Sequence, residues 1–214
     1  MGKFANVWLA GAMAVMAFSS CAEEKKGYVI DGQVTDVKEG MMYLKKYEGK
    51  SFVDVDSTAI VDGKFKFEGV APEALAHGLT TIKGSSRPLV FFLDNDAMKV
   101  TMNESGKEMS VVGSEANDIY LRNAKITRSK DYSLDSLLTA HPTSPVAAYF
   151  VVKDFAYKLD LEGMKAAHAK LDASLAGTEY MNQIESMIAR MEKVQVGSVA
   201  PDFTLPDVNG NPVS

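Results

Sequence analysis

The spacing of hydrophobic and polar positions divides the chain into two parts. From Tyr28 to about Val112 apolar and polar residues alternate with a period of two, which is typical of half-buried β-strands. The clearest case is the segment 64–68, where Phe65 and Phe67 alternate with charged residues. Short strands at this spacing predict an antiparallel β-sandwich.

Turns and one continuous apolar run support this interpretation. Asp62-Gly63 directly precedes the segment 64–68 and suits a tight hairpin, because glycine accepts a positive φ. Leu89–Leu93 is apolar throughout and is expected to be a central strand. The polar turn 94–96 then leads into another alternating segment at 98–102.

After Gly113 the pattern changes to that of helices. Ser133 is expected to cap a short helix. Ser144 followed by Pro145 is a typical helix start, because proline tolerates the first helical position and serine accepts an unpaired backbone N–H. The segment 146–157 is apolar on most sides and is expected to be buried.

Two amphipathic helices are predicted to follow. The first is expected to end at Gly177, and Thr178 is expected to cap the second. The apolar stripe of the first helix consists of Leu161, Met164, His168, Leu171 and Leu175, and that of the second of Tyr180, Ile184, Met187, Ile188 and Met191. The sequence therefore predicts an α+β fold, with an N-terminal β-sandwich at 28–113 and an α-helical connector at 114–195.

The first 20 residues have the pattern of a secretory signal peptide. Lys3 gives a basic start, an apolar stretch runs from Ala5 to Phe18, and small residues follow. The stretch is shorter than the ~18–20 residues that cross a bilayer as a helix. We therefore expect residues 1–20 to be removed and residues 21–27 to form a polar tether.

The end of this segment resembles a bacterial lipobox. The four residues are Phe18-Ser19-Ser20-Cys21, with phenylalanine where leucine is usual. The resemblance implies that Cys21 is diacylated and becomes the mature N-terminus. The protein would then be anchored to a membrane of the bacterial cell envelope, on its periplasmic or outer-membrane face. The alternative is an ordinary signal peptide with an incidental cysteine.

Composition and rare residues exclude several classes of function. The chain has 214 residues and a net charge of −5, which argues against nucleic acid as a partner. Cys21 is the only cysteine, so the chain has no C-x-x-C redox pair and no cysteine-rich zinc site. His77, His141 and His168 do not occur at metal-ligand spacing. We expect no metal, no cofactor and no catalytic residue.

Other polar residues occur in patterns that resemble binding or catalytic sites. The turn 94–96 resembles a calcium loop but lacks its glycine and distal glutamate. Asp54 and Asp56 fall on one face of a regular strand and are expected to face solvent. A third hypothesis is a hydrolase built around Ser57 or His168, but the sequence places no histidine where it could act as a general base for Ser57.

The segment 197–214 resembles the opening of the thioredoxin-like domain in the peroxiredoxin and TlpA/ResA group. The resemblance is carried by Gly197, Ala200, Pro201, Asp202, Phe203, Leu205, Asp207, Gly210, Val213 and Ser214. In that group these residues form a hairpin, and the paired active-site cysteines come later in the chain. Asn209-Gly210 independently predicts a hairpin turn.

Upstream segments are similar to a domain of unknown function that precedes thioredoxin-like domains in Bacteroidetes lipoproteins. These are Asp56-Ser57, Asp62-Gly63-Lys64-Phe65-x-Phe67-x-Gly69 and Gly113-Ser114, with the connector matching at 141–147. The resemblance implies that residues 196–214 begin a thioredoxin-like domain that acts on periplasmic disulfide-bearing proteins. It also implies that this chain is the non-catalytic N-terminal part of a longer thiol–disulfide oxidoreductase. The rival hypothesis is a free-standing lipoprotein that binds a ligand or partner.

Overall fold

The computed structural model describes residues 27–48, 51–105, 108–195, 197 and 204–213. The predicted signal peptide and Cys21 lie outside these residues, so lipidation stays a prediction. In the described part of the chain, no helix is both long and apolar enough to cross a membrane.

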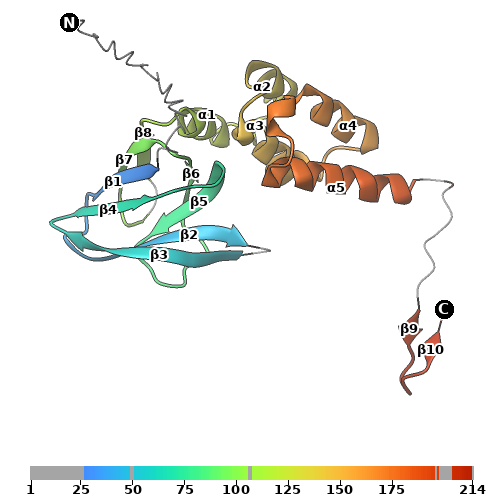
Figure 1. The fold of residues 1–214 in the computed structure, drawn as a ribbon, viewed down its shortest axis with the longest axis horizontal. Helices are drawn as coiled ribbons and strands as arrows, with labels where there is room; N and C mark the ends of the chain where they lie inside the picture. The colour runs from blue at the N-terminus through green and yellow to red at the C-terminus, as the bar shows by residue number, and fades with distance from the viewer. Residues whose placement is uncertain (1–26, 49–50, 106–107, 196, 198–203, 214) are drawn as a thin grey trace, which may run out of the picture.

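The β module is one hydrogen-bonded sheet of eight strands, in the order β6-β5-β2-β3-β4-β1-β7-β8 (Figure 1). Its strands are β1 (Tyr28–Val34), β2 (Glu39–Glu48), β3 (Ser51–Val61), β4 (Lys64–Gly69), β5 (Leu75–Thr80), β6 (Leu89–Leu93), β7 (Ala97–Met102) and β8 (Met109–Val112). β1 and β7 pair in parallel, and the other neighbouring strands pair antiparallel. The α+β class is confirmed.

The strands curl around one core in a nearly barrel-like arrangement, so the predicted sandwich is a single sheet. Every strand contributes a side chain to one buried cluster, from Ile30 on β1 to Val111 on β8. The predicted hairpin is present between β3 and β4, where Asp62 and Gly63 have φ values of 50° and 76°. A Cβ at Gly32 would overlap the Phe65 ring, so the strands approach closely there.

The helices follow the sheet and form a second layer. They are α1 (Glu115–Ala124), α2 (Leu134–Ala140), α3 (Pro145–Phe150), the π-helical turn η1 (Val151–Phe155), α4 (Leu161–Lys170), the 3₁₀ turn η2 (Ala173–Leu175) and α5 (Glu179–Lys193). The predicted caps at Ser133 and Ser144 are confirmed, since each hydroxyl accepts from a backbone N–H of the first turn.

The prediction that one helix continues to Gly177 is wrong. α4 ends at Lys170, and Leu171 is extended with ψ at 140°. The backbone N–H of Asp172 donates to the carbonyl of Pro142 instead of continuing the helix. The Asp172 carboxylate accepts from the N–H of Ser174 and starts the separate turn η2.

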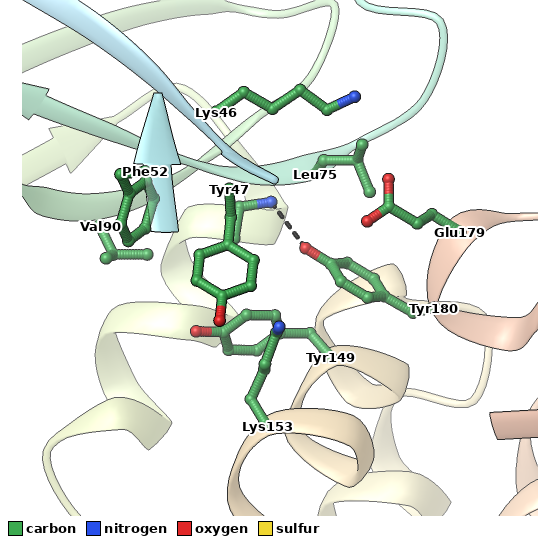
Figure 2. Close-up of a pocket in the computed structure, with 10 residues that line it drawn as sticks. Lys46, Tyr47, Phe52, Leu75, Val90, Tyr149, Lys153, Glu179 and Tyr180 are labelled. Atoms are coloured by element: carbon green, nitrogen blue, oxygen red, sulfur yellow. Dashed lines mark hydrogen bonds between the residues drawn. The ribbon is translucent and has the colours of Figure 1, made fainter. Parts of the chain in front are cut away.

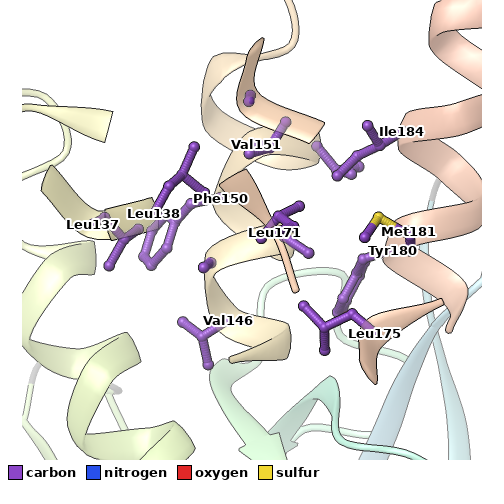
Figure 3. Packing of buried hydrophobic residues seen from close by; sticks show 14 of the residues in the cluster. Leu137, Leu138, Val146, Phe150, Val151, Leu171, Leu175, Tyr180, Met181 and Ile184 are labelled. Atoms are coloured by element: carbon purple, nitrogen blue, oxygen red, sulfur yellow. The ribbon is translucent and has the colours of Figure 1, made fainter. Parts of the chain in front are cut away.

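Strands β5 and β6 contact two cores, one on each face. Phe91 belongs to the cluster inside the sheet, whereas its neighbour Phe92 belongs to a second cluster with the helices. Residues from α2, α3 and α5, such as Leu138, Phe150 and Ile184, fill this second cluster (Figure 3). The burial predicted for the segment 146–157 is confirmed for its first half.

The polar side chain of Asn117 connects α1 to the free edge of β6. Asn117 is fully buried, and its amide accepts from the N–H of Phe92 at 2.8 Å and donates to the carbonyl of Phe92 at 2.6 Å. An amide that both donates and accepts satisfies a strand edge in the way a neighbouring strand would. The helix thus covers an edge that the sheet leaves unpaired.

The C-terminal described residues contain a small hairpin. β9 (Leu205–Pro206) pairs antiparallel with β10 (Pro212–Val213). The Asp207 carboxylate accepts from the backbone N–H groups of Asn209 and Asn211, and Gly210 has a φ of 85°. The hairpin predicted at Asn209-Gly210 is confirmed.

Candidate binding site

A pocket of about 130 Å³ lies where the sheet meets the helices. The end of β2, the start of β3, strands β5 and β6, η1 with the end of α3, and the start of α5 all contribute to it (Figure 2). Its lining residues are Lys46, Tyr47, Phe52, Leu75, Ala76, Val90, Tyr149, Lys153, Glu179 and Tyr180. No single segment of sequence contains the site.

One wall is an aromatic pair from the hairpin. Tyr47 ends β2 and Phe52 begins β3, and the two residues are directly opposite each other in the register. Their ring centroids are 5.3 Å apart at an interplanar angle of 75°. Edge-to-face contact of this kind is favourable and fixes the orientation of both rings.

The opposite wall belongs to an aromatic cluster under the helices. The ring centroid of Tyr149 lies 5.3 Å from that of Phe92 and 5.4 Å from that of Tyr180. Burial raises the pKa of both tyrosine hydroxyls, so both are protonated at neutral pH. These hydroxyls are polar groups in an otherwise apolar wall.

Tyr180 also joins α5 to the sheet. Its hydroxyl accepts a buried hydrogen bond from the backbone N–H of Ala76 at 2.9 Å. β2 pairs with β5 only as far as His77, so Ala76 lies just past the paired part of β5. The hydroxyl oxygen supplies the acceptor that β2 does not, and its own proton can be donated to a further group.

The start of α5 is held by a side chain from the sheet side. A carboxylate oxygen of Glu73 accepts from the backbone N–H of Glu179 at 2.9 Å. Thr178 occupies the predicted capping position, but its side chain makes no cap hydrogen bond. A carboxylate at a helix N-terminus also interacts favourably with the helix dipole. Glu73 therefore positions Glu179 and Tyr180, the two pocket residues at the start of α5.

Two lysines supply positive charge. The Lys153 ammonium lies 3.8 Å from the centroid of the Tyr47 ring, a cation–π contact. Burial lowers the pKa of Lys153, an effect that the charge of Glu179 opposes. Among the described residues, neither Lys153 nor Lys46 has a carboxylate within ion-pair distance.

The lining contains groups that are typical of a ligand-binding site. It combines apolar and aromatic walls with tyrosine hydroxyls and ammonium groups, and it contains no serine, cysteine or histidine. A nucleophile with an adjacent base is the usual requirement of covalent catalysis. Apolar walls with a few placed polar groups are typical of ligand sites.

The three histidines have separate surroundings. His77 is buried, and its Nδ1 lies 3.0 Å from the carbonyl of Leu75, so that nitrogen carries the proton. Burial lowers the pKa of His77. His141 ends α2, and His168 lies 3.5 Å from Glu185. In the part of the chain that the structure covers, no three His, Cys, Asp or Glu residues gather into a possible metal site.

The expectation that Asp54 and Asp56 share a face is wrong because β3 contains a bulge. Leu44 pairs with Asp56 and Lys45 pairs with Asp54, so Val55 is an extra residue. Neighbours along a strand point to opposite faces, and the two aspartates therefore do as well. Asp54 forms an ion pair with Lys45, which is only 1% exposed.

The remaining candidates have structural roles. Asp56 accepts from the backbone N–H of Ser57, and no hydrogen bond among the described residues joins Ser57 to a histidine. In the turn 94–96, the Asn95 amide bonds both backbone groups of Ala71, and Asp94 accepts from the hydroxyl of Ser114. These contacts tie the turn to the neighbouring segments, and the other carboxylate oxygen of Asp94 is buried without a hydrogen-bond partner among the described residues.

The described residues form a curled β-sheet docked on a helical layer, with the pocket between the two. Residues 28–120 match the model of a family described as "Domain of unknown function (DUF4369)". The match spans the eight strands and the first part of α1. No curated protein and no solved structure matches the chain.

Proposed function

We propose that this chain is the lipid-anchored, non-catalytic front part of a cell-envelope thiol–disulfide oxidoreductase. The sole cysteine, Cys21, falls at the lipobox position and has no second cysteine to pair with. The likeness of residues 28–120 to a domain of unknown function agrees with the resemblance to modules that precede thioredoxin-like domains.

The docking of the helices on the sheet carries the proposal. Asn117 bonds Phe92, Tyr180 bonds Ala76 and Glu73 bonds the start of α5, so three buried or half-buried contacts tie the two layers together. A support fixed in this way can orient whatever follows α5. The hairpin of β9 and β10 supports a thioredoxin-like opening at that point.

In the proposed protein the chemistry belongs to the redox domain. A cysteine thiolate there attacks one sulfur of a substrate disulfide, forming a mixed disulfide and releasing the other substrate sulfur as a thiolate. A second cysteine thiolate then attacks the mixed disulfide, which leaves the domain oxidised and the substrate reduced. The present chain contributes the anchor and the orientation.

The coding sequence beyond Ser214 tests the proposal directly. We expect an in-frame C-x-x-C within roughly the next 50 codons, because the paired cysteines follow this opening by some tens of residues in the group that residues 197–214 resemble. In an insulin-reduction assay, the longer protein should be active and residues 1–214 silent. Absence of the cysteine pair contradicts the proposal, and so does activity of residues 1–214 that survives Cys21→Ser.

A second candidate function is a lipoprotein that binds a small ligand. The pocket between the ends of β2 and β3 and the start of α5 favours it, because the pocket has apolar walls and two lysines that form no ion pair with a described carboxylate. Saturable binding of a small molecule supports this function whether or not a redox domain follows. The two candidates are compatible in one protein.

A further inference from the structure

We infer that the pocket lined by Tyr47, Tyr149 and Lys153 binds a small organic monocarboxylate whose apolar part is about the size of a benzene ring. The inference deepens the second candidate function and is independent of the redox proposal. It follows from the volume of the pocket, its apolar walls and the placement of its charges.

The volume sets the size of the apolar part. The pocket holds about 130 Å³. A dry cavity of about 150 Å³ in another protein accepts benzene. The side chains of Phe52, Leu75 and Val90 give the apolar contacts, and the view in Figure 2 shows them on the sheet side of the pocket. A six-membered ring or a branched chain of similar size fits this space.

The charges select an anion. Lys153 is half-buried, and no described carboxylate lies within ion-pair distance of its ammonium. Burial lowers the pKa of Lys153 despite the opposing charge of Glu179, so a carboxylate bound in direct contact with the ammonium offsets part of its desolvation cost. Lys46 adds a second positive charge to the lining. A cationic ligand is disfavoured because the Lys153 ammonium already occupies the face of Tyr47.

Glu179 limits the negative charge of the ligand to one. Its side chain lines the pocket together with the two lysines. Two cations and one anion leave a net charge of +1, which a monocarboxylate neutralises and a phosphate dianion exceeds. The protonated hydroxyl of Tyr180 is a further donor for a carboxylate oxygen, whereas that of Tyr149 is hydrogen-bonded to Tyr120. Tyr180 already accepts from Ala76, so its proton is the group left to donate.

Phenylacetate and its uncharged analogue 2-phenylethanol test the inference. Isothermal titration of the Cys21→Ser chain should show saturable binding of phenylacetate. The alcohol should bind at least about tenfold more weakly, because it lacks the charge-assisted bond to the ammonium. Binding of phenylacetate should also weaken as salt is added. Equal affinity for the two compounds, or no binding of either, overturns the inference.

Variants locate the binding. Lys153→Met should weaken phenylacetate about tenfold and leave the alcohol unchanged, while Val90→Phe should abolish binding of both by filling the pocket. Lys158→Met is the matched control, because Lys158 also lies over an aromatic ring, that of Phe155, but outside the pocket. If Lys153→Met unfolds in a thermal melt, Lys153→Gln replaces it. Unchanged phenylacetate affinity in a folded Lys153 variant contradicts the site.

Discussion

The hydroxyl oxygen of Tyr180 accepts a buried hydrogen bond from the backbone N–H of Ala76, 104 residues earlier in the chain, at 2.9 Å. This bond joins the last helix to strand β5 at the point where β2 no longer pairs with it. The net free energy that one hydrogen bond contributes to folding is small, but a buried N–H that is left without an acceptor costs its full desolvation free energy. Loss of this bond should therefore destabilise the protein. It couples the stability of the helical layer to that of the sheet.

Tyr180→Phe should therefore destabilise the protein although it keeps the ring. We expect a loss of about 1–3 kcal/mol in the free energy of unfolding, the cost of leaving one buried backbone donor unpaired. Urea denaturation followed by circular dichroism measures it. Tyr157→Phe is the control, because Tyr157 is 78% exposed and should change stability by less than about 0.5 kcal/mol. Equal effects of the two substitutions would show that the Ala76 contact is unimportant.

Asn117→Asp should make stability depend on pH. An ionised aspartate cannot donate to the carbonyl of Phe92, whereas a protonated one can. Burial raises the pKa of the new carboxyl, so the folded state binds its proton more tightly than the unfolded state does. The deficit relative to the parent should be smallest near pH ~4 and grow as pH rises through the folded pKa.

Denaturant midpoints measured from pH 4 to pH 8 check this expectation. Asn182→Asp is the control, because Asn182 is exposed and its amide donates to the carbonyl of Gly177. A deficit for Asn117→Asp that stays constant over this range would contradict the strand-like role given to the Asn117 amide.

Because Lys45 and Asp54 form an ion pair, substitutions of the two residues should change the free energy of unfolding by unequal amounts. Asp54→Asn leaves the buried Lys45 charge without its partner and should cost about 1–3 kcal/mol. Lys45→Met removes the buried charge itself and should be nearly neutral or stabilising. Urea denaturation of both variants at pH 7 distinguishes them, and a larger loss for Lys45→Met would contradict the assignment.

The same pair predicts the pH dependence of the parent. The hydrogen bond from Lys45 holds the pKa of Asp54 below its usual value. A lowered folded pKa means that the contribution is present above the unfolded pKa of ~3.9 and is lost as pH falls through the folded pKa. Asp54→Asn should therefore lose less stability than the parent when pH is lowered from 5 toward 2.

Local rules in the sequence predicted most of the elements. Alternation around Phe65 and Phe67 identified β4, and Asp62-Gly63 identified its hairpin. Ser144-Pro145 identified the start of α3. These signals lie within a few residues of the structure they produce, so they can be interpreted without knowing the fold.

Features that depend on distant partners could not be predicted in this way. The bulge at Val55 pairs Asp54 with the buried Lys45, and the one-residue register shift that produces this pairing has no local signal in the sequence. The residue Tyr180 belonged to an apolar stripe that predicted core packing, and only the fold brings it beside Ala76 and into the pocket. A tyrosine within an apolar stripe does indicate a distant hydrogen-bond partner, because a buried hydroxyl needs one, but it does not indicate which residue that partner is.

The pKa of His77 tests whether this side chain of β5, the strand between β2 and β6, is buried. Burial lowers its pKa, and the neighbouring charge of Lys46 acts in the same direction. Its C2-proton resonance should therefore titrate below the usual ~6.5. The chain has three histidines, so loss of the resonance in His77→Gln assigns it.

The same shift fixes the sign of a stability effect. Below pH ~6.5 the unfolded chain takes up a proton at His77 before the folded chain does, so the parent should lose stability as pH falls from 7.5 to 5.5. His77→Gln should show a smaller loss over that range, because it has no proton to gain. A His77 titration midpoint at or above 6.5 would contradict the conclusion that burial disfavours the charged imidazole at this position.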